Sequence, residues 1–269
     1  MNLQRADQAY TKRAIKYGPS DHQEGDLYLP DTSRPPVVCL LHGGFWRIPY
    51  DRTEFDPVAR DLAARGFAVW NLEYRRLGAP GGGWPDTLQD VAAGIDHLAM
   101  VVAEGTELDL NRVTVVGHSA GGHLALWSAA RTDKRGTLRV PTHVRPAAAA
   151  GLAAVVDLAR AHALSVGNSA VGELLEGSPD QQPIRYAAAS PIALLPLGVK
   201  QLIVHGVADE ALPIEVTRNY VQAARAAGDT IQFSELPDAG HMDCLDPCSK
   251  GHMTLCRWLG QSTNTVAVP

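Results

Sequence analysis

A serine flanked by glycines follows a run of β-branched residues in the middle of the chain. The run is Val113–Val116, and Ser119 follows between Gly117 and Gly121. This Gly-x-Ser-x-Gly spacing is typical of a nucleophile elbow, a strained strand-to-helix turn that raises a serine hydroxyl above a parallel sheet. The glycines are needed because the backbone turns too tightly there for a Cβ on either side. Since a serine alone is a poor nucleophile, the motif predicts chemistry only if a base, an acid and an oxyanion hole accompany it.

A candidate acid and a candidate base follow later strands. Asp209 comes after the apolar run Leu202–His205 and a turn, and its carboxylate would accept the Nδ1–H of a histidine. Glu210 is the rival acid, and a helix N-cap is the alternative role for Asp209. His241 follows the last expected strand. The chain order Ser119, Asp209, His241 is the one expected for this kind of elbow, so we predict that these residues are nucleophile, acid and base.

A loop with two glycines is the candidate oxyanion hole. It reads His42-Gly43-Gly44-Phe45-Trp46 and directly follows the apolar run Val37–Leu41. Glycines let the backbone pass close to a reacting carbonyl, so that amide N–H groups can point at the developing oxyanion. The N–H of Ala120, next to the nucleophile, is expected to supply a further donor. His42 is expected to hold the loop by hydrogen bonds, and His118, inside the elbow, to point away from the nucleophile.

Strand and helix patterns alternate along the chain, which predicts an α/β fold with a mostly parallel sheet and helices on both faces. The expected strands are Val37–Leu41, Phe67–Leu72, Arg112–Val116, Pro146–Leu152, Gln201–His205 and Thr230–Leu236. The expected helices are Asp56–Arg65, one opened by Pro85, Ala120–Arg131, Ile214–Ala227 and Pro247–Leu259. We predict a single domain over residues 1–269, with residues 158–195 as a small lid over the carboxyl edge of the sheet.

This set of motifs resembles the α/β-hydrolase superfamily over nearly the whole chain. The loop His42–Trp46 together with Gly117–Gly122 is similar to the branch of kynurenine formamidases (arylformamidases) and related carboxylesterases. Hormone-sensitive-lipase-like esterases are also similar, but they usually carry a third glycine and an acidic residue where this chain has Phe45 and His118. The resemblance implies that the oxyanion donors are the N–H groups of Gly44, Phe45 and Ala120.

The expected substrate is a small molecule, an ester or an amide. Trp46, Tyr74 and Trp84 occur in loops that should face the carboxyl edge, so we predict that they bind an apolar group of the substrate. Core packing is the alternative role for each of them. The sequence contains no phosphate loop, dinucleotide fingerprint or metal-ligand motif, so it implies no cofactor.

Charge and hydropathy indicate which partners and which location to expect for the protein. A net charge of −5 gives no indication of nucleic-acid binding, and the apolar runs are too short or too rich in small residues to span a membrane. Residues 1–7 are polar and lack the apolar core of a signal peptide, which predicts a cytoplasmic location.

Four cysteines occur in the sequence. Cys39 lies in a strand pattern, whereas Cys244, Cys248 and Cys256 lie near His241 and His252. Their spacing repeats no zinc pairing, so we interpret Cys244 and Cys248 as helical neighbours without a metal.

Two classes of function compete. The first is a serine hydrolase that cleaves a carboxylic ester or a simple aryl amide or formamide through an acyl-enzyme. The second is a non-catalytic receptor for small molecules on the same fold, a class that generally loses a triad member, most often the histidine. The presence of Ser119, Asp209 and His241 favours the hydrolase. The sequence leaves the oligomeric state open between a monomer and a homodimer.

Overall fold

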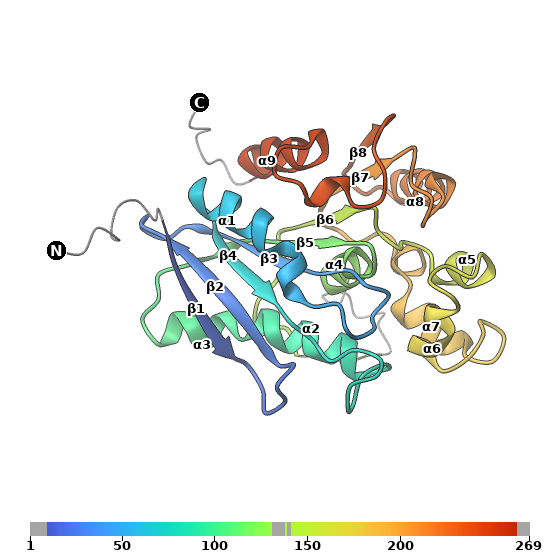
Figure 1. The fold of residues 1–269 in the computed structure, drawn as a ribbon, viewed down its shortest axis with the longest axis horizontal. Coiled ribbons are helices and arrows are strands. Elements are labelled where there is room, and N and C mark those ends of the chain that lie inside the picture. Colours follow the sequence, from blue (N-terminus) through green and yellow to red (C-terminus); the bar gives the residue numbers. More distant parts are fainter. Residues whose placement is uncertain (1–9, 131–137, 139–140, 263–269) are drawn as a thin grey trace.

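An eight-stranded sheet forms the centre of the protein in the computed structural model, which describes residues 10–130, 138 and 141–262 (Figure 1). The strand order is β1-β2-β4-β3-β5-β6-β7-β8. β1 pairs antiparallel with β2 and β2 with β4, and all the other neighbours are parallel. The strands are β1 Tyr10–Lys16, β2 Glu24–Pro30, β3 Pro36–Leu41, β4 Ala68–Leu72, β5 Asp109–His118, β6 Ala148–Leu152, β7 Lys200–Gly206 and β8 Ile231–Leu236. The predicted mostly parallel α/β sheet is confirmed.

Helices cover both faces of this sheet, as predicted. α1 and α9 pack on one face, while α2, α3, α4 and α8 pack on the other (Figure 1). The helices are α1 Asp56–Ala64, α2 Asp86–Asp96, α3 Leu98–Ala103, α4 Ala120–Ala130, α5 Leu158–Ala163, α6 Ala170–Leu175, α7 Pro183–Ala189, α8 Ile214–Ala226 and α9 Lys250–Ser262. Strand β3 shows why both faces are covered. Val37 and Cys39 belong to the core on one face, and Val38 and Leu40 to the core on the other. Alternate side chains point to opposite faces, so a strand that is apolar throughout needs cover on both.

Several helix ends differ from the sequence prediction by a few residues. The last helix begins at Lys250 rather than Pro247 because the Ser249 hydroxyl accepts the N–H of His252 at 3.0 Å and caps the helix there. The helix after the elbow is described to Ala130, and its predicted end at Arg131 lies outside the described residues. The same holds for the polar N-terminal segment 1–7.

The sequence prediction missed the antiparallel strands β1 and β2. β1 lies at the edge of the sheet and most of its side chains are exposed, so it has no apolar alternation to signal a strand. β2 carries a buried charge, Asp26, which pairs with Lys12 and Arg52 at 3.1 Å each. Because a charged residue is buried in β2 through these ion pairs, the strand lacks the apolar pattern by which buried strands are predicted.

The segment between β6 and β7 contains the helices α5, α6 and α7 and the short 3₁₀-helix η2, Pro191–Leu194. The segment corresponds to residues 158–195, for which we predicted an excursion without a strand. In Figure 1 α5, α6 and α7 lie together at one end of the sheet. No helix among the described residues is both long and apolar enough to cross a lipid bilayer.

Candidate active site

Ser119 lies in a strained turn between β5 and α4. Its φ is +52°, in the left-handed region that costs a non-glycine residue about 1–3 kcal/mol. Its N–H donates to the Leu152 carbonyl at 2.9 Å, which holds the turn against β6. A Cβ on Gly117 would collide with the Gly121 carbonyl, and one on Gly121 with the Leu41 carbonyl. The two glycines are therefore required by close backbone contacts on either side of the serine.

Asp209 and His241 are in direct contact, although 32 residues separate them. His241 Nδ1 lies 2.7 Å from Asp209 Oδ2. The other carboxylate oxygen, Oδ1, accepts the N–H groups of Ala211 and Leu212 at 2.8 and 2.9 Å. Asp209 thus fixes both its own turn and the histidine ring. The rival acid, Glu210, lines a cavity beside this pair.

A second histidine, which sequence analysis did not single out, also contacts the carboxylate. His205 in β7 is fully buried, and its Nε2 lies 3.2 Å from Asp209 Oδ2 and 3.0 Å from the Leu212 carbonyl. Burial alone would raise the pKa of Asp209, but hydrogen bonds from His205 and His241 outweigh it and hold that pKa well below its usual value. Asp209 is therefore a carboxylate at neutral pH.

His118, the residue before the candidate nucleophile, connects the elbow to His241. Its Nε2 donates to the His241 carbonyl at 2.9 Å, and the centroids of the two rings lie 4.7 Å apart. Because Ser119 directly follows His118, this contact brings the elbow and the loop after β8 to the same edge of the sheet.

The predicted oxyanion loop has an unusual backbone. Gly44, Phe45 and Trp46 all have positive φ, at +89°, +56° and +55°. The N–H of Gly43 is engaged, because it donates to Glu54 Oε2 at 2.7 Å. The N–H groups of Gly44 and Phe45 make no hydrogen bond within the part of the chain that the structure describes, so both are available to a ligand. Ala120 is the first residue of α4, where a helix N–H has no intrahelical partner.

His42 anchors this loop, as we expected. Its Nε2 lies 2.9 Å from Glu73 Oε1, and its ring stacks on Tyr74 with centroids 4.4 Å apart. The Tyr74 hydroxyl donates to the His42 carbonyl at 2.8 Å. These contacts fix the chain where it leaves β3, because they engage both the side chain and the backbone carbonyl of His42.

The three aromatic residues predicted to bind substrate do not line the cavity beside the site. Trp46 is 1 % exposed, and its Nε1 donates to His123 Nδ1 at 3.2 Å. Tyr74 is fully buried against His42. Trp84 is half-buried with the guanidinium of Arg185 over its ring. Trp46 and Tyr74 therefore have the alternative role, core packing, because each ring finds a buried partner.

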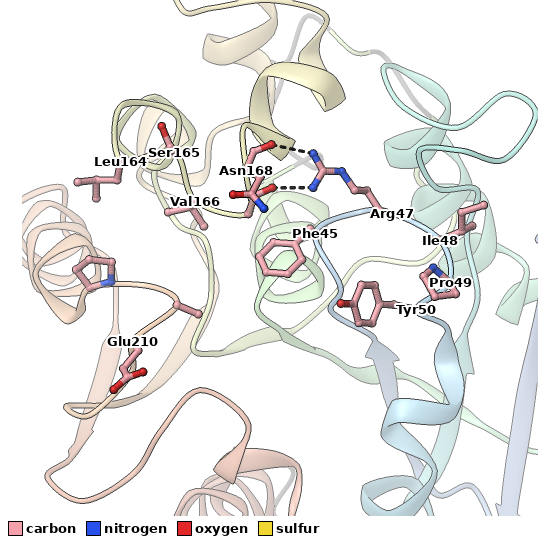
Figure 2. A pocket seen from close by; sticks show the side chains of 13 residues that line it. Phe45, Arg47, Ile48, Pro49, Tyr50, Leu164, Ser165, Val166, Asn168 and Glu210 are labelled. Carbon is pink, nitrogen blue, oxygen red and sulfur yellow. Dashed lines mark hydrogen bonds between the residues drawn. The ribbon is translucent and has the colours of Figure 1, made fainter.

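A cavity of about 610 Å³ opens between three segments at this edge of the sheet (Figure 2). Phe45 of the oxyanion loop and Tyr50, just after this loop, face the cavity, as do Leu164–Asn168 from the excursion and Glu210 from the turn of Asp209. The Arg47 guanidinium joins the first two segments, because it donates to the carbonyls of Gly167 and Asn168 at 2.7 and 3.0 Å.

The cysteines do not form the helical pair that we interpreted from their spacing. Cys244 is buried in the short 3₁₀-helix η3, Asp243–Leu245, whereas Cys248 is exposed in the loop before α9. Both residues precede Ser249, which caps α9, so neither lies in that helix.

A group of potential metal ligands lies elsewhere, between α1 and α9. The donor atoms of Asp61, His252 and Cys256 lie within 4.8 Å of one another. These atoms already bind each other: His252 Nε2 is 2.6 Å from Asp61 Oδ2 and 3.2 Å from Cys256 Sγ. Arg65 donates to both Asp61 oxygens. The group as it stands ties the two helices together.

The chain matches proteins of known families. The family model BD-FAE matches residues 26–223. The esterase LipC of Mycobacterium tuberculosis is 28 % identical over 256 residues, which cover 89 % of this chain and 62 % of LipC. A kynurenine formamidase of Danio rerio is 29 % identical over 113 residues, 41 % of this chain and 36 % of that protein. The chain spans about three fifths of the length of the curated relatives that it matches over most of its own length.

A solved structure shows the same fold. A truncated carbohydrate esterase from gut microbiota superimposes with a TM-score of 0.79 at 22 % identity, covering 97 % of this chain and 99 % of that one. This likeness, with the strand order above, confirms the α/β-hydrolase fold.

Proposed function

This chain belongs to the BD-FAE family, and from that premise we propose that it hydrolyses carboxylic esters of small molecules through an acyl-enzyme on Ser119. The observation that carries the proposal is the 2.7 Å contact between His241 Nδ1 and Asp209 Oδ2. Asp209 thereby selects the tautomer with its proton on Nδ1, which leaves the Nε2 lone pair of His241 to act as a base.

In the proposed reaction the Ser119 hydroxyl attacks the ester carbonyl while His241 Nε2 takes its proton. The negative charge that develops on the carbonyl oxygen is stabilised by the N–H groups of Gly44, Phe45 and Ala120. The Asp209 carboxylate stabilises the imidazolium, which then protonates the departing alcohol. Water attacks the acyl-enzyme with the same proton transfers in reverse, and this step releases the acid and restores Ser119.

The cavity supports a small-molecule substrate. Its volume of about 610 Å³ falls within the range of roughly 300–1,000 Å³ that small-molecule sites occupy. Phe45 and Tyr50 offer aromatic surface, whereas Glu210 offers a carboxylate. We propose that residues 158–195 act as the lid of this cavity, since Leu164–Asn168 form one of its walls. Two relatives agree with this class, because LipC is an esterase and the solved neighbour is a carbohydrate esterase.

An aryl formamide is the second candidate substrate class. The partial match to kynurenine formamidase favours it, and the same triad and oxyanion hole would serve, because an amide carbonyl passes through the same tetrahedral intermediate. A ring such as that of a formanilide would contact Phe45 and Tyr50.

A substrate panel separates these candidates. We would measure kcat/KM for p-nitrophenyl esters of two to eight acyl carbons, for acetylated sugars and for N-formyl-L-kynurenine. Efficient ester cleavage with negligible formamide hydrolysis supports the esterase, and the reverse order supports the formamidase. Binding of these compounds with no turnover of any supports the non-catalytic receptor and rejects the proposal.

We also propose a cytoplasmic location. Cys244, Cys248 and Cys256 are free thiols, as is usual in a reducing compartment. Cell fractionation with an antibody against the chain tests the location. Light scattering on the purified protein decides between the monomer and the homodimer.

A further inference from the structure

Glu54 connects two loops of the candidate active site. It lies in the 3₁₀-helix η1, Arg52–Phe55, and its side chain is 17 % exposed. Oε2 accepts the Gly43 N–H of the oxyanion loop at 2.7 Å, while Oε1 lies 3.8 Å from His118 Nδ1. One carboxylate therefore contacts both the oxyanion loop and the elbow.

His118 extends this connection to the loop of the base. A carbonyl oxygen can only accept a hydrogen bond, so the 2.9 Å contact with the His241 carbonyl requires a proton on His118 Nε2. The Nδ1 of His118 is buried and has no hydrogen-bond partner in the described residues, and the nearest carboxylate is Glu54. The ring is thus held between a carboxylate on one side and the backbone of His241 on the other.

We propose that Glu54 and His118 are positioning residues that couple the oxyanion loop to the loop of the base. Glu54 fixes the Gly43 amide and faces the His118 ring, and His118 fixes the His241 carbonyl. The proposal rests on the function proposed above for His241 and for the N–H groups of Gly44 and Phe45.

The oxyanion loop needs such a restraint. Gly44, Phe45 and Trp46 hold left-handed conformations, and the two non-glycine residues each store about 1–3 kcal/mol of strain that surrounding contacts must offset. The Gly43 N–H is the last amide before this stretch, and a charged acceptor holds it more firmly than a neutral one. Burial alone would raise the pKa of Glu54, but the Gly43 N–H and the neighbouring His118 ring outweigh it and keep that pKa below its usual value.

Substitutions at Glu54 separate positioning from simple packing. Glu54→Ala removes both contacts, whereas Glu54→Gln keeps an acceptor for the Gly43 N–H but removes the charge that faces His118. We expect Glu54→Ala to lower kcat for the best ester by about 10- to 100-fold with KM within twofold, and Glu54→Gln to recover part of the loss. Glu104→Ala, at an exposed glutamate on another surface, is the matched control and should leave kcat unchanged.

The coupling itself is tested by combining the two positions. If Glu54 acts on the base through His118, the loss in the double variant Glu54→Ala/His118→Ala should be no greater than that of the worse single variant. If His118→Ala fails to fold, His118→Phe replaces it, since its ring fills the space but has no donor for the His241 carbonyl. Losses that multiply would overturn the proposal, because they mean that the two residues act separately.

A measurement independent of catalysis keeps this test distinct from that of the proposed function. Hydrogen–deuterium exchange on the full chain should show faster exchange in Glu54→Ala both around residues 43–46 and around residues 237–243. Faster exchange confined to residues 43–46 contradicts the link to the base. A wild-type protein with no esterase activity would reject the proposed function, while the exchange pattern would still decide whether Glu54 couples the two loops.

Discussion

Asp209 Oδ2 is shared by two imidazole rings: His241 Nδ1 lies 2.7 Å away and His205 Nε2 lies 3.2 Å away. The second ring has a defined tautomer. Its Nε2 donates to the Leu212 carbonyl, so its Nδ1 accepts the Thr217 hydroxyl at 2.7 Å. A buried histidine with both ring nitrogens engaged therefore contacts the same oxygen of the candidate acid as the base does.

Replacing this second histidine should weaken catalysis without abolishing it. We expect His205→Gln to lower kcat about tenfold, equivalent to roughly 1.4 kcal/mol, because Asp209 keeps His241 and two backbone amides but loses one restraint. The measurement is kcat and KM for the best ester. Thr217→Val, which removes only the donor to His205, should have a smaller effect in the same direction, and an unchanged kcat in both variants would contradict this role.

The low pKa of Asp209 predicts how stability depends on pH. A carboxyl whose folded-state pKa is depressed stabilises the fold above its unfolded value near 3.8, and this contribution is lost as pH falls through the folded value. Asp209→Asn should therefore lower the free energy of unfolding by about 1.5–3 kcal/mol at neutral pH.

Urea unfolding from pH 3 to pH 8 measures this dependence. The difference between wild type and Asp209→Asn should be constant between pH 5 and pH 8 and shrink below pH 4. A difference that grows on acidification has the opposite sign and would mean that the folded-state pKa of Asp209 is raised.

Two glycines with the same backbone angle provide a matched test of the oxyanion loop. Gly44 and Gly228 both have φ of +89°, but a Cβ on Gly44 would collide with Tyr50, whereas one on Gly228 meets nothing within 4 Å. Alanine at either position carries the left-handed strain of about 1–3 kcal/mol. Only Gly44→Ala should also displace an oxyanion donor, which costs about 10²- to 10³-fold in kcat.

Thermal unfolding and ester kinetics on both glycine variants give the comparison. We expect both variants to lose Tm, Gly44→Ala more because of its collision with Tyr50, and only Gly44→Ala to lose kcat. Equal kcat in the two variants would remove Gly44 from the proposed hole.

Phe45 is expected to limit the size of the substrate. Its side chain faces the cavity while its N–H is a proposed oxyanion donor, so Phe45→Ala should keep the donor and enlarge the site. We predict that the ratio of kcat/KM for octanoyl over acetyl ester rises about three- to tenfold, since each buried methylene contributes about 0.8 kcal/mol. Ile184→Ala, at an exposed residue of α7, serves as the control. A ratio that falls in Phe45→Ala would place the acyl chain elsewhere.

The sequence predicts the parallel part of this fold and the meeting of Asp209 with His241 because both follow from chain order. The run Val37–Leu41 is apolar throughout and Val113–Val116 is β-branched throughout, and residues after parallel strands meet at one sheet edge. The contacts of Glu54, His118 and His205 are not predictable in this way. Each contact is made by a side chain on a short 3₁₀-helix or a buried strand that reaches another loop. The spacing of residues in the sequence does not predict which loop that side chain reaches.

Aromatic residues illustrate the same limit. Trp46 and Phe45 are neighbours in one loop, yet Trp46 turns into the core against His123 while Phe45 faces the cavity. Both have left-handed backbone, which a local pattern of non-glycine residues does not predict. Each side chain points toward the residues against which it packs, and these residues come from distant parts of the chain.

The most direct test of the account is covalent labelling of Ser119. Intact-mass spectrometry after treatment with a fluorophosphonate should show one adduct on the wild type and none on Ser119→Ala. The control variant Ser33→Ala, at an exposed serine distant in sequence from Ser119, should also carry one adduct. Hydrolysis of p-nitrophenyl acetate by Ser119→Ala should fall by more than about 10³-fold. An unlabelled wild type, or full turnover by Ser119→Ala, would contradict the claim that Ser119 is the nucleophile of an ester hydrolase.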